Sequence, residues 1–391
     1  MHDSIYEPGE DSFLIKKHVK QLAKGRVLEI GIGSGILAKT ALENKIDLFT
    51  GVDINPEAIK HCQKTIDDKR AYFVKSNLFE NIPHKQKYDT IIMNPPYLPE
   101  SKTDDKETAR NIAGGKKGYE LIKNFLTEAS TYLKPDGIIL LLFSGFSSKN
   151  KIDSFIKNNL FSYEELDKKS IFFEELFVYK LKKSSLLREL EAINIKRINE
   201  FTKGKRGAIY TGFYKGKKVA IKKQLEGIEA KNTVKNEYQK LSLLNKYHIG
   251  PELILTGKDY FVYNFIEGIF ITNFFKQSEK EQILTALNQI FRQLRKLDQL
   301  QLNKEEMTHP HKHIIITPDS KPVLIDFERC KYTTKPHNVT QFAQFLTSKK
   351  VSIQLETKNI ILNKKHITKL CKEYSKDSCK FEKLLNAIMN Q

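Results

Sequence analysis

The sequence predicts an α/β domain with a parallel sheet over residues 1–181, followed by a two-lobed α+β domain over residues 186–391. In the first part, strand-like apolar runs alternate with helical patterns, which is typical of a parallel sheet covered by helices on both faces. In the second part, short strands with glycines come first and a long amphipathic helix follows. A chain of 391 residues has room for two such cores, and Lys-Lys-Ser-Ser at 182–185 is the expected boundary.

The elements of the first domain are expected at apolar runs separated by turn residues. Five strands are predicted at 26–30, 48–53, 71–74, 90–93 and 137–143, with a closing strand pair within 162–181. Helical patterns are expected at 55–66 and 119–133.

The second domain is expected to begin with a helix at 185–195. Strands are predicted at 208–213, 218–222, 253–257, 260–265, 314–317 and 322–326, and a long helix at 278–300. Apolar positions of that helix recur every three or four residues, which indicates one buried face.

Charge is distributed unevenly between the two parts of a chain with a net charge of +19. Residues 1–180 hold 27 basic and 26 acidic side chains, whereas 181–391 hold 39 basic and 21 acidic side chains. A basic half favours a polyanionic partner such as nucleotide phosphates, RNA or a ribosome-associated protein. The alternative is a solvated, lysine-rich surface.

Cysteine spacing and hydropathy indicate the cellular compartment of the protein and whether it contacts a membrane. Four cysteines without C-x-x-C spacing predict neither a zinc site nor a disulfide framework. No apolar run approaches the roughly 20 residues of a membrane span. We therefore expect a cytoplasmic protein with free thiols and no membrane partner.

A glycine-rich segment, Glu-Ile-Gly-Ile-Gly-Ser-Gly at 29–35, follows the first predicted strand and opens a helix. Glycines allow a tight turn and close approach of a ligand, and a helix N-terminus favours an anion. Asp53 ends the second strand, where a carboxylate can hold ribose hydroxyls. Asn77, after the third strand, is expected to meet the adenine. The candidate cofactor-binding residues are Glu29, Gly31, Gly33, Gly35, Asp53 and Asn77.

The most specific motif is Asn-Pro-Pro-Tyr at the end of the fourth strand, comprising Asn94, Pro95, Pro96 and Tyr97. The Asn94 side-chain carbonyl and the Pro95 backbone carbonyl can each accept one hydrogen from a target –NH2 group. Two prolines restrict the backbone that carries both acceptors, and Tyr97 can stack on a planar target. An amide or aromatic amine is a poor nucleophile, so orientation and desolvation are the available means of catalysis. We predict a catalytic role for all four residues.

Residues 1–181 resemble the HemK-type methyltransferases of the archaeal and eukaryotic kind, through the segments 6–14, 29–35, 94–97 and 114–120. The resemblance implies a Rossmann-like methyltransferase domain that uses S-adenosyl-L-methionine. It also implies, as substrate, the glutamine of a Gly-Gly-Gln motif in a translation termination factor, and a small zinc-binding activator protein that covers an exposed apolar edge. The alternative is an N6-adenine methyltransferase of DNA or RNA. The near-neutral charge of 1–180 argues against it, but the basic second part could supply a face that binds nucleic acid, so this alternative stays open.

Motifs in the second part occur in the order of a protein kinase. Residues 204–212, with Gly204 and Gly207, are similar to a glycine-rich loop, and Val-Ala-Ile-Lys at 219–222 follows at the expected distance. Glu237 is the expected partner of Lys222. Residues 325–328, Ile-Asp-Phe-Glu, resemble the metal-binding D-F-G segment, with Asp326 as the ligand. The resemblance implies a protein-kinase-like domain that binds ATP with Mg²⁺.

The predicted catalytic loop, Glu-Met-Thr-His-Pro-His-Lys-His at 306–313, departs from the kinase pattern. It resembles an archaeal group of predicted serine/threonine kinases related to the RIO and Bud32 kinases. Counting back from Asp326 places His313 at the metal-binding Asn and Thr308 at the catalytic Asp, and Glu306 is the nearest carboxylate that can act as acid/base. Two alternatives stay open: a metal site of three histidines within this loop, and a catalytically silent ATP- or RNA-binding module.

Overall fold

The computed structural model describes residues 5–96, 117–171, 174–204, 207–225 and 233–390. Contacts divide the chain into two compact units, residues 1–200 with 212–216 and residues 201–211 with 217–391. Each unit is described by itself. Among the described residues, no helix combines the length and apolarity needed to cross a membrane.

The first unit is built on a seven-stranded sheet with the strand order β3-β2-β1-β4-β5-β7-β6. Strands β1 to β5 pair in parallel, and β7 runs antiparallel to both of its neighbours. The parallel strands and the closing pair confirm the α/β prediction. The strands are β1 (Gly25–Ile30), β2 (Ile46–Asp53), β3 (Ala71–Lys75), β4 (Tyr88–Met93), β5 (Leu133–Ser144), β6 (Phe161–Ile171) and β7 (Glu174–Lys183).

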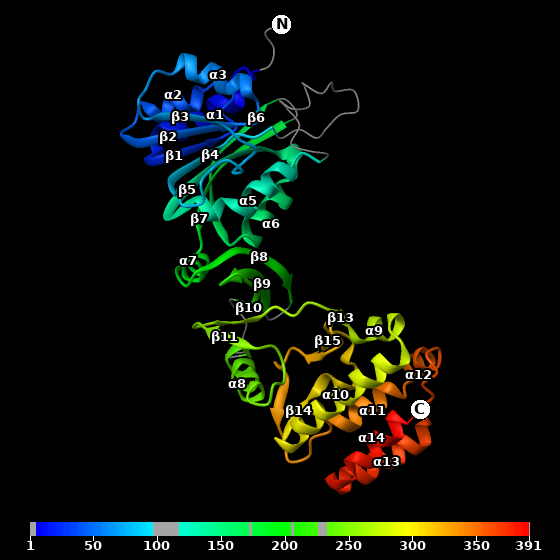
Figure 1. Ribbon diagram of the computed structural model, residues 1–391. Coiled ribbons are helices and arrows are strands. Elements are labelled where there is room, and N and C mark those ends of the chain that lie inside the picture. The colour runs from blue at the N-terminus through cyan, green and yellow to red at the C-terminus, as the bar shows by residue number, and fades with distance from the viewer. Residues whose placement is uncertain (1–4, 97–116, 172–173, 205–206, 226–232, 391) are drawn as a thin grey trace. The chain divides into compact units, whose positions relative to one another are not determined.

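Helices cover this sheet on its two faces (Figure 1). One core cluster joins apolar side chains of α1, α2 and α3 to those of the central strands. Helices α5 and α6 pack against each other, and α5 also packs against β5. The helices are α1 (Glu10–Leu22), α2 (Ile36–Leu42), α3 (Pro56–Thr65), α5 (Glu120–Tyr132), α6 (Lys149–Asn158) and α7 (Ser185–Ala192). The sheet thus has the Rossmann-like, doubly covered arrangement, in which ligands bind beyond the carboxyl ends of the strands.

A second sheet has five strands in the order β11-β12-β10-β9-β8. Strand β12 runs antiparallel to β10 and to β11. Helix α8 packs against β10, β11 and β12. The elements are β8 (Ile195–Lys203), β9 (Gly207–Tyr214), β10 (Lys217–Gln224), α8 (Thr233–Asn245), β11 (Leu253–Thr256) and β12 (Tyr260–Asn264). Strand β8 was not expected from the sequence.

Residues 269–390, all in the second unit, are mainly helical and contribute to one large apolar core. Helix α10 contributes seven buried side chains at the predicted spacing, which confirms the long amphipathic helix. The elements are β13 (Ile269–Phe270), α9 (Ile271–Gln277), α10 (Lys280–Gln299), β14 (Leu302–Lys304), β15 (Ile314–Ile316), β16 (Pro322–Leu324), β17 (Cys330–Tyr332), α11 (Asn338–Leu346), α12 (Lys349–Glu356), α13 (Lys364–Lys376) and α14 (Phe381–Met389). The antiparallel pairs β15–β16 and β14–β17 bring the loop 305–313 and the segment 325–329 close to each other.

Candidate functional sites

A pocket of about 410 Å³ lies in the first unit, beyond the carboxyl ends of β1, β2 and β4. This edge is where open α/β sheets bind their ligands. Its lining includes every described candidate for cofactor binding in this unit except Gly35, together with Asn94, Pro95 and Pro96. Tyr97 lies outside the described residues. Two buried residues of α1, Asp11 and Ser12, also line the pocket.

The glycine-rich turn and Asp53 are tied together by backbone hydrogen bonds. Gly33 N donates to Asp53 Oδ2 over 3.0 Å, and Asn55 N donates to Asp53 Oδ1 over 2.8 Å. Gly33 has φ +50°, and a Cβ built on it meets nothing within 4 Å. A side chain there would project into the space left for a ligand, so glycine serves both the turn and the approach. The turn therefore presents Asp53 and open backbone to the same pocket.

Glu29 is a buried carboxylate of this pocket, with only 2% of its surface exposed. Its Oε2 has no hydrogen-bond partner. Burial, with Asp53 nearby, raises the pKa of Glu29 well above its usual range. A buried polar atom without a partner costs free energy unless a ligand satisfies it. The carboxylates and glycine turn fit a ligand that carries a ribose and an amino acid, as S-adenosyl-L-methionine does.

Asn94 follows β4, and its side-chain amide is held in one orientation. Its Nδ2 donates to Asp11 Oδ2 over 3.0 Å and lies 3.5 Å from Ser12 Oγ. Tyr6 donates its hydroxyl proton to Asp11 Oδ1 over 2.9 Å, so both oxygens of that carboxylate are engaged. The buried Asn94 Oδ1 has no partner. A carboxylate only accepts hydrogen bonds, so Asp11 selects the rotamer in which Nδ2 faces α1 and Oδ1 is free to accept.

Asn77 lines the same pocket after β3, and its Nδ2 donates to Glu80 Oε1 over 2.9 Å. Gly35 lies at the N-cap of α2 with φ +77°, a left-handed conformation that suits glycine. The contribution of Asp11 was not anticipated. It belongs to the segment 6–14 that carries the family resemblance, but nothing in its spacing to Asn94 reveals a contact across 83 residues.

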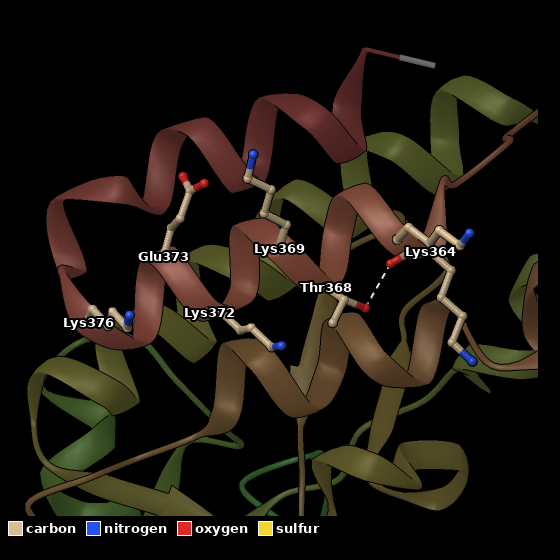
Figure 2. A pocket seen from close by; sticks show the side chains of 7 residues that line it. Lys364, Thr368, Lys369, Lys372, Glu373 and Lys376 are labelled. Atoms are coloured by element: carbon tan, nitrogen blue, oxygen red, sulfur yellow. Dashed lines mark hydrogen bonds between the residues drawn. The ribbon is translucent and has the colours of Figure 1, made fainter.

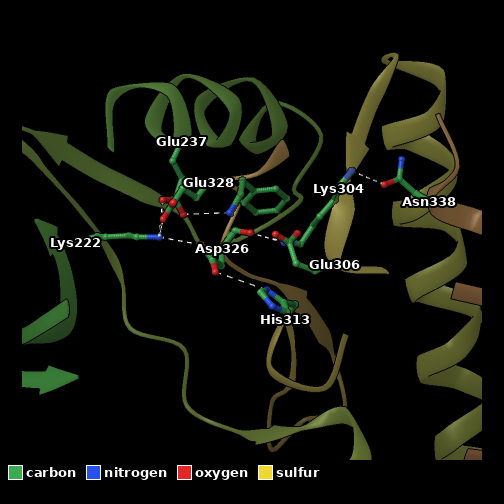
Figure 3. Close-up of polar contacts among 9 residues, drawn as sticks. Lys222, Glu237, Lys304, Glu306, His313, Asp326, Glu328 and Asn338 are labelled. Atoms are coloured by element: carbon green, nitrogen blue, oxygen red, sulfur yellow. Dashed lines mark hydrogen bonds and ion pairs between the residues drawn. The ribbon is translucent and has the colours of Figure 1, made fainter. Parts of the chain in front are cut away.

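A second cluster of charged side chains lies in the second unit (Figure 3). Lys222 Nζ, on β10, is 2.6 Å from Glu237 Oε2 on α8 and 2.9 Å from Asp326 Oδ1 after β16. Glu328 Oε2 is 3.9 Å away. Burial disfavours the charged lysine, but the carboxylates of Glu237 and Asp326 outweigh it and raise the pKa of Lys222. The structure therefore brings Lys222 together with its expected partner Glu237 and with Asp326, the predicted metal ligand.

Three carboxylates of this cluster could hold a cation. One oxygen each of Glu237, Asp326 and Glu328 lie within 4.8 Å of one another. Burial favours the neutral acid of Asp326, but Lys222 outweighs this effect and holds the pKa of Asp326 below its usual range. Oxygen ligands of this kind suit Mg²⁺. Glu328, which stands where kinases have glycine, was not among the predicted ligands.

Asp326 has φ +62°, a left-handed backbone that costs energy for a residue other than glycine. Its carbonyl accepts a hydrogen bond from Lys304 Nζ, a side chain with no exposed surface. The next residue, Phe327, donates its N–H to Glu237 Oε1 over 3.1 Å. Lys304 N in turn donates to Asn338 Oδ1 over 2.7 Å. Lys304 was not predicted, and it is one of the groups that hold the strained segment in place.

The loop 305–313 places Glu306 and His313 beside this cluster. Glu306 Oε2 is 3.0 Å from Lys304 Nζ, and His313 Nδ1 is 3.7 Å from Asp326 Oδ2. Burial and the nearby Lys304 lower the pKa of His313, which favours the neutral imidazole. Counting back from Asp326 placed Thr308 at the position of a catalytic Asp. In the structure Thr308 Oγ1 lies 3.2 Å from His309 Nδ1.

The three histidines of this loop do not converge, so the alternative of a three-histidine metal site is wrong. His309 contacts Thr308, and the His311 ring packs edge-on against Phe345. In the described part of the chain, the group that could hold a metal consists of carboxylates alone.

Gly204 N donates to Gly207 O over 2.9 Å. The residues between them, 205–206, lie outside the described ranges.

The parallel sheet, the glycine turn with Asp53, and Asn94 at the end of β4 define an S-adenosylmethionine-dependent methyltransferase. A family model described as "Methyltransferase small domain" matches residues 9–173. A protein of Methanocaldococcus jannaschii described as "Putative protein N5-glutamine methyltransferase" is 35% identical over 182 residues, 46% of this chain and 91% of that protein. The chain therefore belongs to the protein N5-glutamine methyltransferase family.

Two further similar proteins each match less than half of the chain. The release factor glutamine methyltransferase of Koribacter versatilis is 34% identical over 125 residues, which is 29% of this chain and 45% of that protein. The chain thus spans less than half of that bacterial relative. A solved Mtq2–Trm112 complex from E. cuniculi, described as methylating the termination factor eRF1, matches at 23% identity and a TM-score of 0.38. The match covers 46% of this chain and 99% of that one.

Proposed function

We propose that the first unit methylates the side-chain amide of glutamine in the Gly-Gly-Gln motif of a translation termination factor. The observation that carries this proposal is the buried Asn94 Oδ1, which lacks a partner in a pocket built for S-adenosylmethionine. An amide –NH2 that donates to this oxygen is positioned against the methyl donor. Fixed acceptors of this kind act through orientation rather than by removing a proton beforehand.

Membership in the protein N5-glutamine methyltransferase family supports an amide acceptor over an adenine amine. The test is transfer of labelled methyl groups from S-adenosylmethionine by the full chain to a termination factor, duplex DNA or RNA, each offered alone and in competition. We expect label on the protein alone. Label on adenine that outcompetes the protein would instead establish the nucleic-acid alternative.

A small zinc-binding protein is the partner we propose for this unit. Strand β3 forms one edge of the sheet, and its Tyr72 is 55% exposed. An edge strand offers unpaired backbone groups to which another chain can add a strand. This edge supports the apolar docking surface that the family resemblance implied.

In this geometry Asp11 positions the side-chain amide of Asn94. Replacing Asp11 by asparagine should therefore disturb the orientation of that amide. The new amide could donate as well as accept, so Asn94 could turn its Nδ2 toward the target –NH2, where two donors would face each other. We expect Asp11→Asn to lower kcat by roughly tenfold, the order of a lost hydrogen bond to a charged group. The affinity for S-adenosylmethionine should change little. Steady-state kinetics and calorimetry measure the two effects.

A double-mutant cycle separates positioning from a structural role. In an Asn94→Ala background, Asp11→Asn should have no further effect on kcat, because no amide is left to orient. Full additivity of the two losses would contradict the positioning role.

For the second unit we propose binding of ATP with Mg²⁺ by a kinase-like site, and slow phosphotransfer with Glu306 as acid/base. Support comes from the contacts of Lys222 with Glu237 and Asp326, and from the carboxylate group beside them. A nucleotide would bind with its phosphates at Lys222, and the cation would be held by Asp326 and Glu328. His313 faces Asp326 where kinases place an asparagine ligand. The other candidate is a catalytically silent ATP-binding module, in which the nucleotide binds at the same residues but no phosphotransfer takes place.

ATP turnover by the wild type distinguishes these two candidates, and Glu306→Gln tests the acid/base role of Glu306. The substitution keeps the size of the side chain but removes its capacity to accept a proton, so ATP binding should persist while ATP hydrolysis or autophosphorylation falls by at least tenfold. Glu305→Gln is the matched control, since Glu305 is an adjacent carboxylate that pairs with Lys331. Unchanged turnover in Glu306→Gln, with both variants binding ATP, would refute the acid/base role of Glu306. A wild-type chain that binds ATP without any turnover would leave the silent module as the function.

A further inference from the structure

Helix α13 carries a positively charged face that neither proposed catalytic site uses. It contains five lysines, all of them exposed. At 100° per residue, four of them fall within an arc of about 60°, and the opposite side packs into the core through Ile367, Leu370, Cys371 and Tyr374. The lysine face consists of Lys365, Lys369, Lys372 and Lys376, with Lys364 beside it.

A hollow of about 640 Å³ runs along this helix (Figure 2). All of its lining residues belong to α13: the five lysines, Thr368 and Glu373. The single acid, Glu373, is paired with Lys383 Nζ at 2.9 Å. The hollow is therefore cationic along its length, over about 18 Å at 1.5 Å per residue.

The spacing of the lysines destabilises helix α13. Lys365 and Lys369, Lys369 and Lys372, and Lys372 and Lys376 are like-charge neighbours at spacings of three or four residues, which destabilise a helix. Lys364 and Lys365 also lie in the first turn, where the helix dipole disfavours cations. Residues that destabilise a helix without improving its packing are typical of functional positions. A bound polyanion would turn each of these repulsions into a favourable contact.

The chemistry of the face identifies the kind of polyanion. All five cations are lysines, which bind phosphate as point charges, and no arginine fork is present in the lining to recognise carboxylates. The lining contains no apolar side chain that could insert into a bilayer. It also contains no aromatic ring on which an unpaired base could stack. Contact with a sugar–phosphate backbone, without reading of bases, is what remains.

We propose that the lysine face of α13 binds the phosphate backbone of structured RNA. The pattern of lysines alone supports a ligand with a sugar–phosphate backbone. The choice of RNA over DNA rests on the proposed function, because a termination factor works on the ribosome. The face holds RNA nonspecifically near the enzyme and takes no part in methyl transfer.

The experiment measures binding of the full chain to a 20-base-pair RNA duplex and to a DNA duplex of the same sequence, over a range of salt concentrations. The test variant is K365E/K369E/K372E/K376E. The matched control is K217E/K246E/K258E/K276E, which reverses four exposed lysines elsewhere in the same unit with the same change in net charge. Methyl transfer to a free termination factor is measured in both variants and should equal that of the wild type.

We expect the lysine-face variant to lose at least tenfold in RNA affinity and the control less than threefold. Each phosphate contact contributes about 0.9 to the slope of log K against log salt, so the slope should fall by about three to four. Equal losses in the two variants, or tighter binding of DNA than of RNA, would overturn the proposal. A chain that binds RNA through this face but methylates no termination factor would refute only the proposed acceptor.

Discussion

Replacing Asn94 by alanine is expected to lower the rate of methyl transfer by about 10²–10³-fold, the usual loss when a fixed acceptor or donor of the reacting group is removed. The amide of Asn94 is held by Asp11 so that its Oδ1 has no partner in the protein. In the proposed function this oxygen accepts a hydrogen bond from the target nitrogen and does not contact the methyl donor. Binding of S-adenosylmethionine, measured by calorimetry, should therefore stay nearly intact.

Asp53→Ala is the reciprocal control. Its carboxylate accepts hydrogen bonds from the N–H groups of Gly33 and Asn55, and we propose that it lines the part of the pocket that binds the cofactor. We expect this variant to weaken S-adenosylmethionine binding by roughly tenfold or more. If Asn94→Ala kept more than half of the wild-type rate, Asn94 would not be the residue that orients the amide.

Asp326→Asn is expected to reduce ATP–Mg²⁺ affinity by about 10- to 100-fold, the range for a lost contact to a charged group. Asparagine tolerates the left-handed backbone at φ +62°, so the segment can keep its conformation. The amide is a weaker ligand for a hard cation than the carboxylate it replaces. Titration calorimetry with ATP and magnesium on the full chain, saturated with S-adenosylmethionine, measures the change.

Asp319→Asn serves as the matched control, because Asp319 is an exposed carboxylate that pairs with Lys321. It should bind ATP as the wild type does. If the wild-type chain shows neither heat nor a thermal shift with ATP and magnesium or manganese, the second unit is not a nucleotide-binding module.

The variant Lys222→Ala is expected to change both protein stability and ATP binding, so it does not separate the two effects. Removing Lys222 leaves Glu237 and Asp326 facing each other without a cation, and breaking a buried ion pair costs ~3–5 kcal/mol. We therefore expect lower stability as well as lost nucleotide binding in that variant. Asp326→Asn isolates the ligand effect.

The centre of the first unit's sheet could be predicted because β1, β2, β4 and β5 each contain a buried run of apolar residues. All five runs and the closing pair lie within strands of the structure. Strand β8 was missed because only Ile195 and Ile198 are buried along it. The preceding helix ends at Ala192, short of the expected 195, where Asn194 adopts φ +65°.

Positions fixed by the backbone at strand ends, such as Asp53 and Asn94, could be found from motif and order alone. Asp11 and Lys304 could not, because their roles depend on contacts with residues distant in the chain. Lys304, for example, receives its position from Asn338, which is itself held by Asp298 through Nδ2 at 2.7 Å. Burial of these polar groups follows from tertiary packing, which local spacing does not reveal.

The most direct measurement locates the transferred methyl group by tandem mass spectrometry of a termination factor treated with the full chain and S-adenosylmethionine. We expect one methyl group on the side-chain nitrogen of the glutamine in Gly-Gly-Gln, and none on a factor in which that glutamine is replaced by glutamate. A methyl group on a lysine, on a carboxyl oxygen, or on the glutamate-substituted factor would contradict the amide-binding role of Asn94.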